Sequence, residues 1–186
     1  MSEIILETKD LTKHFGTFRA VDGLNLKVSK ACIFGFLGPN GAGKSTTLRM
    51  ILSLIKPSSG SVRIFGQDLQ THRTQILGRI GAIIEKPDFY PYLSGIENLR
   101  LLSRWYGLRP DARKIEEMLD RVGLSGRGKD LVSAYSHGMK QRLGLAQAMM
   151  HDPELYILDE PTTGLDPKGI IELRELILDL KRVYNK

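Results

Sequence analysis

The fold of this chain is decided by eight consecutive residues, Gly38-Pro39-Asn40-Gly41-Ala42-Gly43-Lys44-Ser45. They match the pattern G-x-x-x-x-G-K-[ST]. The apolar run over residues 31–37 precedes them, and it predicts a strand buried on both faces. Residues 46–55 then predict a helix that ends before Lys56-Pro57. This context favours a phosphate-binding loop, and the alternative is an ordinary glycine-rich turn.

The chemistry expected of the loop follows from its residue types. Glycines allow positive φ angles, so successive backbone N–H groups can turn inward around an anion, and the following helix adds its positive end. In such a loop Lys44 reaches the β- and γ-phosphates, and the Ser45 hydroxyl binds Mg²⁺. We therefore expect residues 38–46, which end with Thr46, to bind ATP with magnesium.

A second feature is a pair of acids at the end of a short apolar strand, residues 155–158. A strand delivers its last residues to the carboxyl edge of a sheet, where ligands bind in doubly wound folds. Asp159 is then placed to hold Mg²⁺, and Glu160 to act as general base on the attacking water. The alternative is two solvated acids that cap a turn before Pro161.

The rest of the chain alternates between predicted strands and helices. Strands are expected at residues 3–8, 18–28, 61–65 and 80–84, with a turn or bulge at Asp22-Gly23, and helices at residues 93–106, 111–122, 136–150 and 168–183. This order predicts an α/β fold with a mainly parallel sheet and right-handed crossovers. A single domain is expected, with residues 1–86 and 141–186 as its core and residues 87–140 as an inserted helical subdomain.

The composition sets weaker limits. Lys and Arg outnumber Asp and Glu by 27 to 21, which fits either a nucleic-acid or membrane-surface partner or an ordinary solvated surface. The single cysteine, Cys32, lies in the apolar run, so we expect it to be buried and the compartment to be reducing. The sequence has no signal-peptide pattern and no apolar run of about 18 residues, so any membrane role is expected to come through a partner.

Between the two motifs stands the segment Tyr135-Ser136-His137-Gly138-Met139-Lys140-Gln141-Arg142. The order of phosphate loop, this segment and acid-ended strand resembles the nucleotide-binding domain of ATP-binding-cassette (ABC) transporters over essentially the whole chain. The resemblance implies a P-loop NTPase core with an N-terminal antiparallel β portion. The segment is similar to the family's signature, usually Leu-Ser-Gly-Gly-Gln, of which Ser136 and Gly138 are retained.

The resemblance also implies roles for single residues. Phe15 matches the aromatic residue that stacks on adenine, and Asp166 belongs to the loop that communicates between two domains. Two such domains pair head to tail and enclose two ATP, each between the phosphate loop of one copy and residues 136–139 of the other. Ser136 can also be a plain helix N-cap, and Phe15 a core aromatic. His137 and Met139 depart from the signature, and His137 adds bulk beside the expected phosphate site.

Glu85 is a further departure, because the family has a neutral Gln magnesium ligand at this place. The resemblance makes Glu85 a magnesium ligand with a full negative charge. Together with residues 89–99 it resembles the branch that exports bacitracin and lantibiotic-type peptides and confers immunity or resistance. A histidine that contacts the γ-phosphate and the last strand and helices of the family would fall beyond Lys186. The chain therefore resembles a C-terminally truncated domain that hydrolyses ATP poorly by itself.

Taken together, the resemblance implies an ATP-binding and ATP-hydrolysing exporter subunit with Glu160 and Lys44 as catalytic residues. Its expected partners are a transmembrane permease, docked near residues 85–105, and a second copy of the chain, without nucleic acid. The permease would hold it at the cytoplasmic side of the membrane. One alternative is a soluble ABC ATPase acting on ribosomes or DNA, although the chain shows neither a second cassette nor a long coiled coil. The other is a non-hydrolysing ATP sensor, which would not need Glu160.

Overall fold

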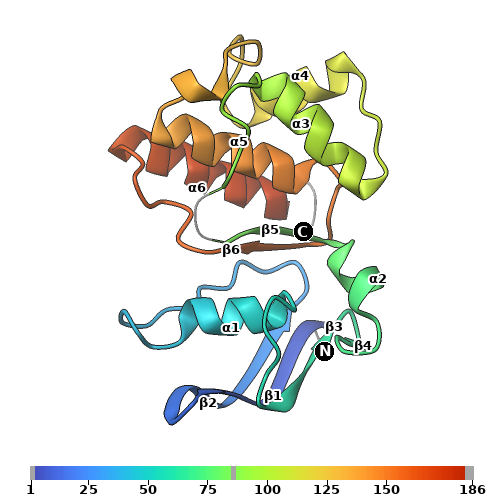
Figure 1. Ribbon diagram of the computed structural model, residues 1–186, viewed down its shortest axis with the longest axis vertical. Helices are drawn as coiled ribbons and strands as arrows, with labels where there is room; N and C mark the ends of the chain where they lie inside the picture. Colours follow the sequence, from blue (N-terminus) through green and yellow to red (C-terminus); the bar gives the residue numbers. More distant parts are fainter. Residues whose placement is uncertain (1–2, 85–86, 183–186) are drawn as a thin grey trace. The chain divides into compact units, whose positions relative to one another are not determined.

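The computed structural model describes residues 3–84 and 87–182 (Figure 1). The chain divides into two compact units, the first ending at Gly78 and the second beginning at Arg79. Each unit has its own sheet and its own helices, and each is described by itself. Glu85, the expected magnesium ligand, lies outside the described residues. No helix within the described ranges is long and apolar enough to cross a bilayer.

The first unit is built on an antiparallel sheet. Its strand order is β2-β1-β3-β4, and its elements are β1 Ile4–Phe15, β2 Phe18–Ser29, α1 Lys44–Ile51, β3 Ser59–Ile64, β4 Gln67–Asp68 and α2 Arg73–Leu77. Apolar residues from strands and helices form its core, including the fully buried Leu11, Ile64 and Ile76. The ladder between β1 and β2 shifts register opposite Asp22-Gly23, where Gly23 has a φ of +58°. This confirms the predicted bulge.

The prediction of a buried strand over residues 31–37 is wrong for this structure. Residues 32–39 belong to no strand, and Ile33, Phe34 and Leu37 are exposed, Leu37 by 90%. A strand requires a ladder partner, and the described sheet of this unit is completed by four other strands. Cys32 is likewise exposed rather than buried, and its thiol donates to the Ser29 carbonyl at 2.9 Å.

The second unit combines a parallel strand pair with helices. Strand β5 pairs with β6 in parallel, and the elements are β5 Ile80–Ile83, α3 Gly95–Ser103, η1 Arg104–Tyr106, α4 Ala112–Arg121, η2 Val132–Ala134, α5 His137–Met149, β6 Leu155–Leu158 and α6 Pro167–Arg182. The residues between the two strands supply the crossover that a parallel pair needs. Helices α3, α4 and α5 contact one another (Figure 1). Strands β5 and β6 and these three helices therefore appear close to the positions that the sequence predicts.

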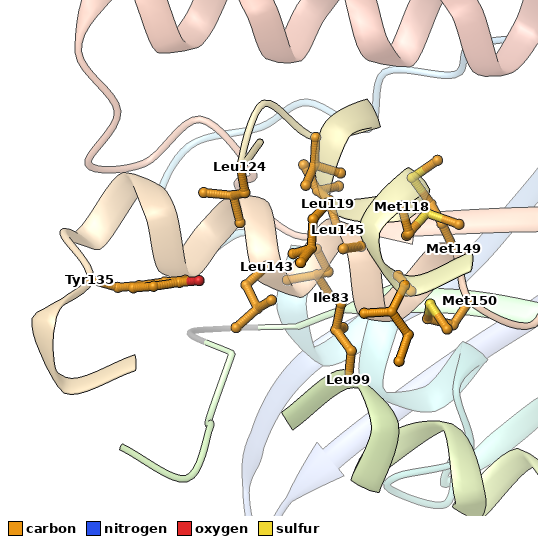
Figure 2. Packing of buried hydrophobic residues seen from close by; sticks show 14 of the residues in the cluster. Ile83, Leu99, Met118, Leu119, Leu124, Tyr135, Leu143, Leu145, Met149 and Met150 are labelled. Carbon is orange, nitrogen blue, oxygen red and sulfur yellow. The ribbon is translucent and has the colours of Figure 1, made fainter. Parts of the chain in front are cut away.

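One hydrophobic cluster stabilises the second unit (Figure 2). Ile83 of β5 joins Leu99 of α3, Leu119 of α4 and Leu143 of α5, and the last three are at most 2% exposed. Full burial of one such side chain contributes about 1.5–3 kcal/mol. The cluster extends to Leu180 of α6, so the long helix α5 is packed on several sides and forms the rigid centre of the unit.

Three helices of this unit begin at side-chain caps. The Ser94 hydroxyl accepts the Glu97 N–H, and the Glu97 carboxylate accepts the Ser94 N–H in return, which forms a capping box. These bonds from Ser94 lower the pKa of Glu97 below its ordinary value. Asp111 caps α4 by accepting the Lys114 N–H, and Ser136 caps α5 by accepting the Met139 N–H. Local chemistry therefore explains why these helices begin at their predicted positions.

The predicted α/β class is confirmed, with an antiparallel sheet in the N-terminal unit. The parallel part among the described residues consists of β5 and β6. The proposed division of the chain at residues 87 and 140 stays a prediction.

Candidate functional site

The glycine-rich loop has the backbone geometry expected of an anion nest. Gly41 and Gly43 have φ angles of +82° and +86°, a region that side chains other than glycine rarely adopt. The Ala42 N–H donates to the Pro39 carbonyl at 3.2 Å and closes the turn. Gly43 is the N-cap of α1, and Thr47 donates the first helical bond to its carbonyl at 2.8 Å. The N–H groups of this turn are thereby joined to a helix N-terminus, the arrangement that favours phosphate oxygens.

The ammonium group of Lys44 lies across the mouth of this loop. Its Nζ donates to the carbonyls of Gly38 at 2.8 Å and Pro39 at 3.0 Å. A Cβ at Gly38 would come within 3.3 Å of the Ala42 Cβ, so a side chain there would crowd the turn at Ala42. The first turn of α1 contains no acid, and Ser45 and Thr46, both half-buried, follow Lys44 in it. The loop therefore combines the Lys44 ammonium group with a helix N-terminus whose first turn carries no acid, and both favour an anion.

The tip of the β1–β2 hairpin lies beside the phosphate loop. A Cβ at Gly43 would stand 2.3 Å from the Ala20 carbonyl oxygen, so loop and β2 touch there. Val21 pairs with Lys13 of β1, two residues before Phe15. Phe15 is 51% exposed, which favours a stacking role over a core position, and Lys13 Nζ lies 5.2 Å from the centre of its ring.

The two acids follow β6 in the second unit. The Asp159 N–H donates to the Ile83 carbonyl at 2.8 Å, which extends the β5–β6 pairing by one bond. Glu160 has a φ of +44° and an exposed side chain. Thr163 holds it twice, because its hydroxyl donates to Glu160 Oε2 at 3.3 Å and its N–H donates to the Glu160 carbonyl at 3.0 Å. The carboxylate of Glu160 is thus open to solvent but fixed in direction.

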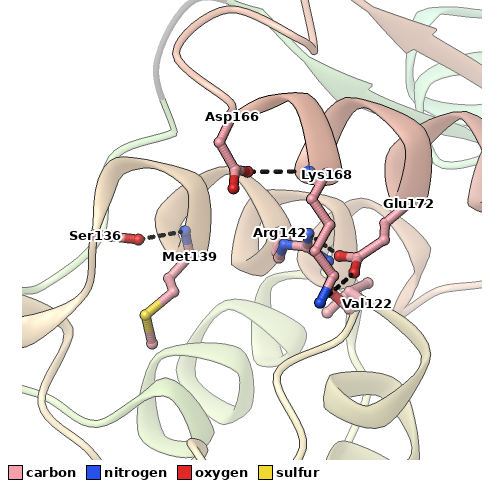
Figure 3. Close-up of polar contacts among 8 residues, drawn as sticks. Val122, Ser136, Met139, Arg142, Asp166, Lys168 and Glu172 are labelled. Carbon is pink, nitrogen blue, oxygen red and sulfur yellow. Dashed lines mark hydrogen bonds and ion pairs between the residues drawn. The ribbon is translucent and has the colours of Figure 1, made fainter.

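The signature-like segment forms the beginning of α5. Ser136 is its N-cap, and the Ser136 hydroxyl accepts the Met139 N–H at 3.2 Å (Figure 3). The ring of His137 turns toward the loop after Glu160, where its Nε2 lies 3.2 Å from the Thr163 carbonyl. A Cβ at Gly138 would stand 3.2 Å from Leu165 Cδ2, so the two residues lie close together. Through His137 and Gly138, this segment therefore contacts the same loop that carries Glu160 and Asp166.

Asp166 has a structural role in this chain. Its Oδ1 accepts the Gly169 N–H at 3.0 Å in the first turn of α6 (Figure 3). Nearby, Arg142 of α5 donates to the Val122 carbonyl at 3.1 Å and forms an ion pair with Glu172, which Lys168 approaches at 3.7 Å. These bonds hold α5, α6 and the end of α4 together.

The structure thus forms two groups of the expected site residues. Phe15 and residues 38–46 lie in the first unit, and residues 136–139, 159, 160 and 166 lie in the second. The described residues contain no group of three or more His, Cys, Asp or Glu side chains that could hold a metal. The Ser45 hydroxyl and the Asp159 carboxylate are hard oxygen donors of the kind magnesium takes.

The sequence did not predict two sets of contacts that hold the site residues in place. Thr163, which holds Glu160, could have been suspected from its position three residues after the acid, where a hydroxyl returns to the preceding turn. The ion pair between Arg142 and Glu172 spans 30 residues, and no local pattern indicates it.

Comparison with known proteins agrees with this geometry. The profile of the ABC transporter family matches residues 21–163. The bacitracin transport ATP-binding protein BcrA of Bacillus licheniformis is 51% identical over 97% of this chain, and that of Enterococcus faecalis is 46% identical over 96%. The chain spans 59% and 58% of the length of these two relatives.

Solved structures give the same result. The ATP-binding subunit of an ABC transporter is 32% identical, with a TM-score of 0.82 over 95% of this chain and 75% of that one. The ATP-binding cassette MJ0796, a dimer in a post-hydrolysis state with ADP and Pi, is 26% identical, with a TM-score of 0.87 over 98% of this chain and 85% of that one. The chain belongs to the ABC transporter family, of which it is an ATP-binding domain.

Proposed function

We propose that this chain is the ATP-binding and ATP-hydrolysing part of an exporter that moves a drug or an antimicrobial peptide through a separate membrane permease. The observation that supports it most is that one chain carries both a glycine nest closed by Lys44, in its first unit, and a solvent-open Glu160 held by Thr163, in its second. Relatives named for bacitracin transport favour a peptide as the exported compound. In this proposal the permease holds the chain at the cytoplasmic face of the membrane.

The nucleotide-binding steps fall to the first unit. The backbone N–H groups around Gly41 and Gly43 and the N-terminus of α1 would bind the phosphates, with Lys44 turning from the Gly38 and Pro39 carbonyls to the β- and γ-phosphate oxygens. The exposed ring of Phe15 would stack on adenine. Ser45 and Asp159 would hold magnesium, which when bound neutralises charge on the phosphates. Glu85 is a third proposed ligand.

Hydrolysis would depend on the second unit. The Glu160 carboxylate would accept a proton from the attacking water, and Thr163 would keep it pointed there. Ser136, His137, Gly138 and Met139 form the positive end of α5 and would face the γ-phosphate of ATP bound by a second copy. We propose a head-to-tail dimer for this reason, with Asp166 in the loop between the copies. Nucleic acid has no part in this scheme.

Two variants separate binding from turnover. Lys44→Ala should weaken ATP binding strongly, since it removes the ammonium group that lies against the Gly38 and Pro39 carbonyls, whereas Lys56→Ala, at an exposed position of the same unit, should not. Glu160→Gln should bind ATP normally and lose hydrolysis, and exposed Glu116→Gln is its matched control. Binding is measured by calorimetry and hydrolysis by phosphate release. Normal turnover by Glu160→Gln would refute the catalytic assignment.

The export role needs its own test. The chain should co-purify with a membrane protein, and deleting it in cells should raise sensitivity to bacitracin-like peptides. Co-purification with ribosomes or DNA instead, with unchanged peptide sensitivity, would contradict the exporter proposal.

A further inference from the structure

We infer that His137 is a positioning residue for ATP hydrolysis, acting on Glu160 through Thr163. The inference rests on the proposed role of Glu160 as general base. It concerns a position where this chain departs from the usual signature, which has glycine there. All of the residues involved lie in the second unit and within the described residues.

The contacts form a continuous chain from α5 to the acid. His137 Nε2 lies 3.2 Å from the Thr163 carbonyl oxygen. A carbonyl can only accept, so this ring nitrogen carries the proton and donates. Thr163 in turn donates its hydroxyl to Glu160 Oε2 and its N–H to the Glu160 carbonyl. Thr163 is thus bonded to His137 on one side and to Glu160 on the other.

The neighbouring glycine is shaped to admit the histidine ring. Gly164 has a φ of +77°, and a Cβ there would stand 2.4 Å from His137 Cδ2 and 2.7 Å from its Nε2. The imidazole therefore packs directly on the backbone of the loop. Van der Waals contact at this place adds to the hydrogen bond and restricts where Thr163 can lie.

Glu160 needs such support. It is exposed, and its φ of +44° is a left-handed conformation that residues other than glycine rarely adopt. A strained turn keeps its geometry only when its surroundings hold it. The helix α5 offers a fixed reference, because Ser136 caps it and its residue Leu143 is fully buried. His137 is the first residue of that helix, and it transmits this rigidity to the loop.

The role predicts a specific kinetic pattern in the assembled transporter. His137→Leu keeps the bulk and removes the donor, so kcat should fall roughly three- to tenfold, the size of one neutral hydrogen bond, while KM for ATP stays unchanged. His137→Gln places an amide N–H at similar reach and should retain most of the wild-type kcat. Thr163→Val should lower kcat as well. The kcat of the double variant His137→Leu/Thr163→Val should be no lower than that of whichever single variant has the lower kcat. His72→Leu, at the exposed N-cap position of α2 in the first unit, is the control.

Amide hydrogen exchange supplies a readout independent of activity. The Thr163 N–H, bonded to the Glu160 carbonyl, should exchange faster in His137→Leu than in the wild type or in His137→Gln.

Three results would overturn the inference: an unchanged kcat in His137→Leu, a raised KM with kcat retained, or equal damage in His137→Gln and His137→Leu. The raised KM would mean that the ring contacts the nucleotide instead. If Glu160→Gln still hydrolyses ATP, the proposed catalytic role of Glu160 fails. In that case unchanged exchange at Thr163 in His137→Leu refutes the positioning contact, and faster exchange supports it.

Discussion

Gly43→Ala should destabilise the first unit by more than its positive φ alone accounts for. The angle of +86° costs an alanine about 1–2 kcal/mol. In addition, the new Cβ would stand 2.3 Å from the Ala20 carbonyl oxygen and 3.1 Å from the Val21 side chain. The first contact is with backbone, so β2 or the loop must move, and such overpacking costs about 1–3 kcal/mol more. We expect a total of about 2–5 kcal/mol.

Gly41→Ala is the matched control. Its φ of +82° is nearly the same, but a Cβ there meets nothing within 4 Å. It should therefore cost only the conformational part, about 1–2 kcal/mol. The free energies of unfolding of both variants are measured by urea titration and compared. The titrations are done without nucleotide, so that phosphate binding does not affect the result. If Gly43→Ala is no less stable than Gly41→Ala, the contact between the loop and β2 does not exist as described.

Three further predictions concern the second unit. Ser136→Ala should lower the free energy of unfolding by about 1 kcal/mol through loss of the cap, while Ser136→Asp should not; equal losses in urea titrations would contradict a capping role. Leu143→Ala should cost about 2–5 kcal/mol because its site is fully buried, and Leu143→Met less than about 1.5 kcal/mol; similar values would mean that the core is loosely packed. Burial lowers the pKa of His151, whose Nε2 donates to the Ile80 carbonyl and whose Nδ1 has no partner within the described residues. The neutral ring is therefore favoured on folding, so stability is full above about pH 6.5 and falls as the pH drops through the lowered pKa. His151→Phe, which keeps the stack on Tyr106, should flatten this dependence in thermal melts, and an unchanged slope would refute it.

Local patterns in the sequence were sufficient for several features. The glycine loop requires positive φ angles that few other residues adopt, and the structure has them at Gly41 and Gly43. The strand at Leu155–Leu158 appears with its predicted bounds, since four apolar residues before two acids leave little choice. Ser136 begins α5 because a hydroxyl can satisfy a free N–H of the first turn without help from distant residues.

Local patterns could not predict whether the apolar run over residues 31–37 is buried. Its apolar composition predicts that it would be buried if neighbours covered both faces, but composition does not say which strands pair. In the structure the first unit completes its sheet with β1 to β4, and Ile33, Phe34 and Leu37 stay exposed.

The sequence by itself therefore determined the phosphate loop, the acid pair and the helix starts, because each depends on residues within a few positions of one another. Only the tertiary structure decided what holds these parts. His137 meets Thr163 across 26 residues, and Arg142 meets Glu172 across 30. Such contacts depend on how α5 packs against the loop after β6 and against α6. Short-range sequence patterns do not predict that packing. For this reason the sequence pointed to Glu160, and only the fold shows how it is held.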